Sequence, residues 1–158
     1  DNPLRQAMKN SLFNPTQCLA RTEAVKEIGG CDERVVHSQE YSMTLRLAQR
    51  WPIMKVDAPI AFIPREGMRL SNNEARQLQR VTRALALFLC DHPDVGIDLR
   101  RFACRRAAGR AWHYARRHAG AGYGSPWFRR YIASYFASGR DASSFIATCC
   151  DAFELEKS

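Results

Sequence analysis

The stretch after residue 71 restricts the fold of this chain most, because it carries a run of helix signals with marked starts and ends. Ser71 and Glu74 fit the S-x-x-E capping box, and Ser125 followed by Pro126 is a second helix start. Between such signals, apolar residues recur at the spacing of one helix face. The sequence therefore predicts an α-helical region over residues 71–158. The four expected helices cover about 72–91, 98–118, 126–139 and 142–153.

Length and composition fit one folded domain. The chain has 158 residues, of which 46% are hydrophobic, and a chain of this size buries about 70% of its unfolded surface without help from disulfides or metals. The longest uncharged apolar stretch, Ala84 to Cys90, is far shorter than the ~20 residues of a membrane span. The six cysteines form no CxxC pair, which predicts free thiols in a reducing compartment. The first residue is not Met, and we expect a piece of a longer protein.

Positive charge is concentrated in one segment of the chain. Residues 97–140 hold ten arginines and one aspartate, and so account for the excess in the net charge of +8. The arginines are at positions 100, 101, 105, 106, 110, 116, 117, 129, 130 and 140. Three interpretations remain open: solvated side chains, contact with anionic lipid headgroups, or nucleic-acid binding. Nucleic acid is the least favoured of the three, because the sequence has no helix-turn-helix, RNA-recognition or zinc-finger signature.

Residues 1–70 mix strand and helix signals. Short apolar runs bounded by Pro or Asn predict strands at residues 17–21, 53–56 and 60–63. Two helices are predicted, at Glu23 to Ile28 and at Gln39 to Arg50, with Ser38 as the cap of the second. Alternation of strands and helices is typical of an α/β fold.

Two motifs in this first part resemble those of family 2 glycosyltransferases. The segment Gly29 to Glu33 reads Gly-Gly-Cys-Asp-Glu, and Gln39 to Arg46 reads Gln-Glu-Tyr-Ser-Met-Thr-Leu-Arg. In that family, Gly-Gly-Phe-Asp-Glu is followed by Glu-Asp-(Tyr or Trp)-x-Leu-x-Leu-Arg. Its members are inverting enzymes of GT-A fold that use nucleotide-diphospho-sugars. The resemblance implies that residues 1–70 are the C-terminal part of a GT-A catalytic domain. The whole chain would be an α/β fragment with a helical extension over 71–158, mostly α overall.

The resemblance also implies the roles of individual residues. Glu40 stands where the family has its catalytic aspartate, the general base that takes the proton of the acceptor hydroxyl. Gln39 replaces a family glutamate, and Arg65 and Arg69 lie where a basic loop closes over the diphosphate. An acidic residue in a first helical turn also commonly serves only the helix dipole. The implied substrate-binding residues are Gly29, Gly30, Asp32, Glu33, Gln39, Arg65 and Arg69.

The partners follow from the same resemblance. A bacterial enzyme of polysaccharide biosynthesis would take a nucleotide-sugar donor and a saccharide or lipid-linked acceptor. Its divalent cation, Mn or Mg, would be held by an Asp-x-Asp motif, which this chain lacks. We therefore expect the chain alone to hold no metal, to be inactive and to self-associate through the face where the missing half would dock. The expected location is cytoplasmic, with peripheral contact at the inner membrane through the Arg-rich helices. The alternative is a non-catalytic basic helical module that docks on a membrane, a protein or nucleic acid.

Overall fold

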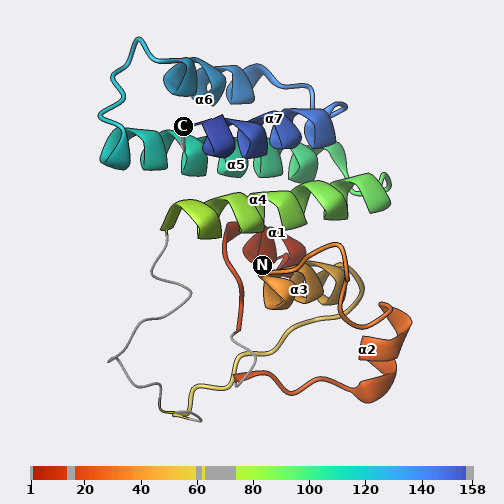
Figure 1. Ribbon diagram of the computed structural model, residues 1–158. Coiled ribbons are helices and arrows are strands. Elements are labelled where there is room, and N and C mark those ends of the chain that lie inside the picture. The colour runs from red at the N-terminus through yellow and green to blue at the C-terminus, as the bar shows by residue number, and fades with distance from the viewer. Residues whose placement is uncertain (1, 14–16, 60–61, 63–73, 156–158) are drawn as a thin grey trace.

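The computed structural model describes residues 2–13, 17–59, 62 and 74–155, and these form seven α-helices and no strand (Figure 1). In chain order the helices are α1 (Pro3–Lys9), α2 (Thr22–Glu27), α3 (Gln39–Arg50), α4 (Glu74–Asp91), α5 (Ile97–His118), α6 (Pro126–Phe136) and α7 (Ala142–Leu155).

The helices form a stack with α6 at one end and α2 at the other (Figure 1). Helix α5 packs against α6 and α7, and α4 packs against α7 on one side and α3 on the other. Helix α1 lies against both α3 and α5. The α1–α3 pair is thus held under α4, and α2 lies outside the stack (Figure 1).

One apolar core runs through most of the stack. It joins fully or nearly buried residues of five helices, among them Leu4 of α1, Leu45 of α3, Leu85 of α4, Cys104 of α5 and Ile146 of α7. Residues from both sides of position 70 therefore share a single core. A smaller apolar cluster lies at the C-terminal end of α5. It includes Trp127 of α6 and Phe153 of α7.

Helix α5 packs against α1, α4, α6 and α7, and its buried face is made of small side chains. Ala103, Ala107, Ala111 and Ala115 are at most 2% exposed. Small residues let neighbouring helices approach closely, and close approach maximises contact between their surfaces. On the α6 side, a Cβ at Gly109 would lie 3.6 Å from the Tyr131 ring.

The predicted α/β fold is wrong, because the described residues contain no sheet. Residues 17–21 and 53–56 are not strands, and Leu19, Met54 and Val56 point into solvent. A strand needs a neighbour that pairs with its backbone N–H and C=O groups, and no such neighbour lies among the described residues. Of the third predicted strand, only Phe62 is described, and it is exposed too. The mostly α part of the prediction fits.

Most of the helix predictions are confirmed, with corrections at the ends. Helix α3 has the predicted bounds, and α6 begins at Pro126 with the Ser125 hydroxyl accepting from the N–H of Phe128, but it ends at Phe136. The side chain of Ser38 does not cap α3. Helix α1 was not predicted, although Asn2 caps it and Pro3 opens it, because seven residues are too few for a clear apolar period.

Candidate functional site

The Gly-Gly pair ends helix α2 by a Schellman motif. The N–H of Gly30 donates to the carbonyl of Val25 and that of Gly29 to the carbonyl of Lys26, each at 2.9 Å. Gly29 and Gly30 have φ of 76° and 67°, which L side chains rarely adopt. The two glycines thus set the direction in which the following loop, residues 31–38, leaves the helix.

Two arginines of α3 fasten the end of α2 to α3. Arg46 Nη1 donates to the carbonyl of Ile28 at 2.6 Å, and Arg50 Nη1 donates to that of Glu27 at 3.4 Å. These carbonyls have no partner within α2, so guanidinium donors satisfy them. Desolvation by burial lowers the pKa of Arg46. Helix α2, the Gly-Gly turn and α3 therefore form one local unit, held together by hydrogen bonds from α3 to the end of α2.

Asp32 is engaged by Arg34. Its two carboxylate oxygens accept from Arg34 Nε at 2.9 Å and Nη2 at 2.8 Å, and the Asp32 side chain is only 13% exposed. The same guanidinium also pairs with Asp91 at the end of α4, where Nη1 lies 3.2 Å from Oδ1. The hydrogen bonds from Arg34 hold the pKa of Asp32 below its usual value. Arg34 thus connects Asp32 of the loop to Asp91 at the end of α4.

Removing the guanidinium of Arg34 is expected to make the free energy of unfolding depend less on pH in the acid range. Because the pKa of Asp32 is lowered in the folded state, its contribution is present above the ordinary value of 3.8 and is lost as the pH falls through the folded value. Arg34→Met should lower the free energy of unfolding by about 1 kcal/mol at neutral pH and by less at about pH 3. Urea unfolding at both pH values measures this. Arg116→Met, an exposed arginine of α5, is the control, and an equal loss at both pH values would contradict the assignment.

Glu40 lies in the first turn of α3, and its side chain is half-buried. None of the described residues forms a hydrogen bond or ion pair with its carboxylate. Its backbone carbonyl accepts from the Thr44 hydroxyl at 2.6 Å, which fixes the first turn. Two residues earlier, Ser38 has a φ of 62°, the one left-handed non-glycine residue in the described part of the chain. Backbone strain of this kind is common at functional sites, where it helps to orient neighbouring side chains.

The sequence-predicted site residues fall into two groups. Gly29, Gly30, Asp32, Glu33, Gln39 and Glu40 all belong to the unit formed by α2, its loop and α3. Glu33 and Gln39 are exposed. Arg65 and Arg69 lie outside the described residues.

Many of the arginines of α5 turn inward, which the sequence did not predict. Arg100 donates to the carbonyls of Leu89 at 3.0 Å and Gly139 at 3.1 Å. The arginines of α5 that bond to backbone carbonyls of other segments are Arg100, Arg101, Arg106 and Arg110. Part of the arginine excess therefore stabilises the packing of α5 against neighbouring segments.

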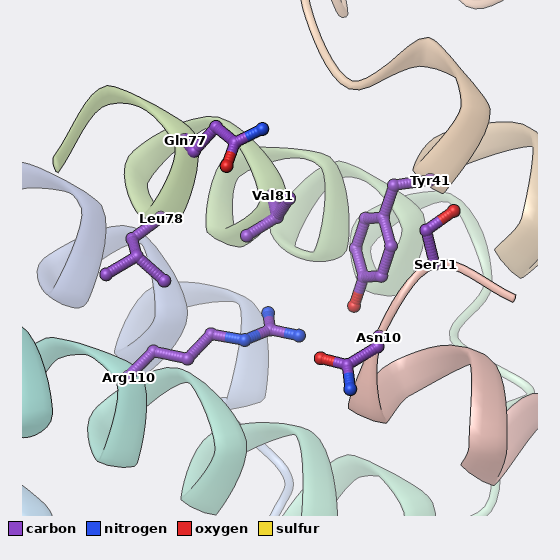
Figure 2. Close-up of a pocket in the computed structure, with 7 residues that line it drawn as sticks. All are labelled: Asn10, Ser11, Tyr41, Gln77, Leu78, Val81 and Arg110. Carbon is purple, nitrogen blue, oxygen red and sulfur yellow. The ribbon is translucent and has the colours of Figure 1, made fainter. Parts of the chain in front are cut away.

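A pocket of about 180 Å³ lies where α1, α3, α4 and α5 meet (Figure 2). Its lining residues are Asn10, Ser11, Tyr41, Gln77, Leu78, Val81 and Arg110. The guanidinium of Arg110 reaches from α5 toward Asn10 and the Tyr41 hydroxyl (Figure 2). Sequence reasoning missed this pocket, since Arg110 is one of ten arginines with no local feature to distinguish it.

The cysteines offer no activated nucleophile in the core. All six are free thiols, as the sequence predicts. Burial raises the pKa of Cys104 to about 11 and that of Cys149 to about 12, so both are protonated at neutral pH. Among the described residues, no group of three or more His, Cys, Asp or Glu side chains is placed to hold a metal ion.

None of the helices in the described ranges is both long and apolar enough to cross a membrane.

Comparison with known proteins gives no match: no protein family fits the sequence, and neither a curated protein nor a solved structure is significantly similar to it. A function has to be inferred from the residues and their geometry.

Proposed function

We propose that this chain is the C-terminal portion of an inverting glycosyltransferase similar to family 2, with Glu40 as its general base. The observation that supports the proposal is the state of the Glu40 carboxylate. It is half-buried and unpaired among the described residues, and it follows a Gly-Gly-x-Asp-Glu loop that α3 itself supports. The α/β fold of that family is not part of the proposal, since the described residues are helical.

The chemistry needs one carboxylate free to accept a proton. In inverting transfer, Glu40 takes the proton from an acceptor hydroxyl while that oxygen bonds to the anomeric carbon and the bond to the diphosphate breaks. Glu40 lies in the first turn of α3, at the positive end of the helix dipole. The unpaired state of Glu40 leaves it available to the hydroxyl.

The loop before α3 supplies a second carboxylate for the acceptor. Asp32 is occupied by Arg34, whereas Glu33 is exposed and can accept hydrogen bonds from sugar hydroxyls. We propose that the divalent cation of such an enzyme is held by an Asp-x-Asp motif outside this chain, whose sequence contains no Asp-x-Asp. When bound, the cation would neutralise charge on the departing diphosphate.

We propose that exposed apolar side chains of the loops outside the helix stack form a face for association. Leu19, Met54, Val56 and Phe62 are between 65% and 101% exposed, and a contiguous exposed apolar patch marks an interaction site. We propose that the rest of the enzyme covers these residues in the longer protein. We further propose a cytoplasmic location, with the exposed arginines near the inner membrane and a saccharide or lipid-linked acceptor.

The chain by itself is expected to self-associate through this face. Light scattering across a concentration series should show dimers or larger species, because burial of exposed apolar area stabilises an assembly by about 25 cal/mol per Å². Replacing Leu19 and Phe62 by serine should shift the equilibrium toward monomer. Replacing the exposed Ile132 of α6 by serine is the control. A wild-type chain that stays monomeric at high concentration would contradict the expectation.

The proposed activity is tested on the longer protein that contains this chain. Release of nucleoside diphosphate from a panel of nucleotide-sugars with Mn²⁺, in the presence and absence of saccharide acceptors, measures transfer. Acceptor-dependent release that requires Glu40 supports the proposal. Transfer that is unaffected by the loss of Glu40 would favour the alternative, a non-catalytic basic module.

A further inference from the structure

Two arginines of α5 hold the end of α1. Arg106 Nη2 donates to the carbonyl of Lys9 at 2.8 Å, and Arg110 Nη2 donates to the carbonyls of Lys9 at 2.9 Å and Met8 at 3.2 Å. These contacts satisfy the last carbonyls of α1, where the helix dipole is negative. They use one nitrogen of each guanidinium group.

One further nitrogen of each arginine is buried and without an acceptor among the described residues. These nitrogens are Nε of Arg106 and Nη1 of Arg110. Neither arginine forms an ion pair with a described carboxylate. Burial and the neighbouring charge of Arg110 lower the pKa of Arg106. A half-buried charge without a counter-charge is costly, so this pair favours an anion nearby.

The pocket in front of Arg110 can take such an anion. Its described lining contains no carboxylate, and the amides of Asn10 and Gln77 are its uncharged donors (Figure 2). The hydroxyl of Ser11 also lines the pocket, but it donates to the carbonyl of Phe13 at 2.7 Å. A water needs only about 10–15 Å³ of such space. A pocket of about 180 Å³ therefore has room for a phosphate group.

We propose that this pocket binds a phosphate or diphosphate group, with the Arg110 guanidinium as the main ligand and Arg106 supplying a second positive charge beside it. A guanidinium group suits phosphate because its N–H groups are charged donors and it stays protonated. Nη2 of Arg110 is engaged by the carbonyls of Lys9 and Met8, and Nη1 is the nitrogen of Arg110 without an acceptor. The pocket touches α3 at Tyr41, the residue after Glu40. The proposal goes beyond the transferase activity and does not depend on Glu40.

Binding is measured on this chain by calorimetric titration with inorganic phosphate and pyrophosphate, and by sedimentation with phosphatidylcholine vesicles that contain phosphatidic acid. Arg110→Met removes the main ligand. Asn10→Asp keeps the shape of the side chain and places a carboxylate in the pocket. Arg116→Met removes an exposed arginine of the same helix and is the matched control for charge.

Arg110→Met and Asn10→Asp are each expected to weaken binding about tenfold or more, because a hydrogen bond to a charged group contributes about 1.5–3 kcal/mol. Arg116→Met should bind phosphate and pyrophosphate as the wild type does. Binding of the soluble anions identifies a site for free phosphate groups. Binding of vesicles alone, if Asn10→Asp abolishes it, identifies a lipid headgroup as the source.

Arg110→Met also removes contacts to α1, so circular dichroism and the midpoint of thermal unfolding are recorded for each variant. Asn10→Asp is expected to fold and to raise the melting temperature, because its carboxylate compensates the two arginines. The proposal is overturned if wild type binds neither the soluble anions nor the vesicles. It is also overturned if Asn10→Asp binds them as well as Arg116→Met does.

Discussion

Glu40→Gln is expected to lower glycosyl transfer by the longer protein about a hundredfold or more, while the affinity for the nucleotide-sugar stays unchanged. Glutamine keeps the size of the side chain but cannot take a proton from the acceptor hydroxyl. Helix α3 should not be disturbed, because no described residue is bonded to the Glu40 carboxylate. Steady-state kinetics measures the rate of transfer, and titration with the nucleotide-sugar measures its affinity.

Two further variants make this test specific. Glu23→Gln is the matched control, because Glu23 is also a first-turn glutamate, on α2, and is exposed. It should leave transfer unchanged. Glu40→Asp, which restores the residue that the resembling family has, should keep far more activity than Glu40→Gln. Equal transfer by Glu40→Gln and the wild type would remove Glu40 from the mechanism.

Leu85→Ala is expected to lower the free energy of unfolding of the isolated chain by about 3 kcal/mol or more. Leu85 is 0% exposed and lies on α4, which packs against α3, α5 and α7. Truncation loses the transfer free energy of the removed carbons and leaves a cavity that close-packed neighbours fill only in part. Urea denaturation at low protein concentration measures the change.

Leu19→Ala is the control, since it makes the same chemical change at a leucine that is 101% exposed. Its effect should stay within about 0.5 kcal/mol. A loss at Leu85 no larger than the loss at Leu19 would mean that the shared core does not stabilise the fold as described.

The sequence predicted most helices because their signals are local. An apolar period over twelve residues sets α3, and a Ser-Pro pair sets the start of α6. The strand predictions failed for a non-local reason. The runs at 17–21 and 53–56 have the composition of strands, but a strand forms only where another backbone pairs with it. Composition alone does not report whether that partner is present.

The candidate site divides in the same way. The order of the Gly-Gly turn, Asp32 and Glu40 could be read along the chain, and each lies in one local unit. Arg34, which bonds to Asp32, also pairs with Asp91, 57 residues further on. No spacing rule finds a pair at that separation, because it arises from the packing of the loop against the end of α4.

By itself, the sequence determined the helical periods, the turn at Gly29 and Gly30, the position of Glu40 in a first turn and the excess of arginine in the second half of the chain. These depend on backbone preferences and charges that act within a few residues. Only the tertiary structure decided that Arg106 and Arg110 face the end of α1 beside a pocket, and that the strand-like runs remain unpaired. Burial and counter-charge are set by what packs against a side chain, and that neighbour can come from any part of the chain.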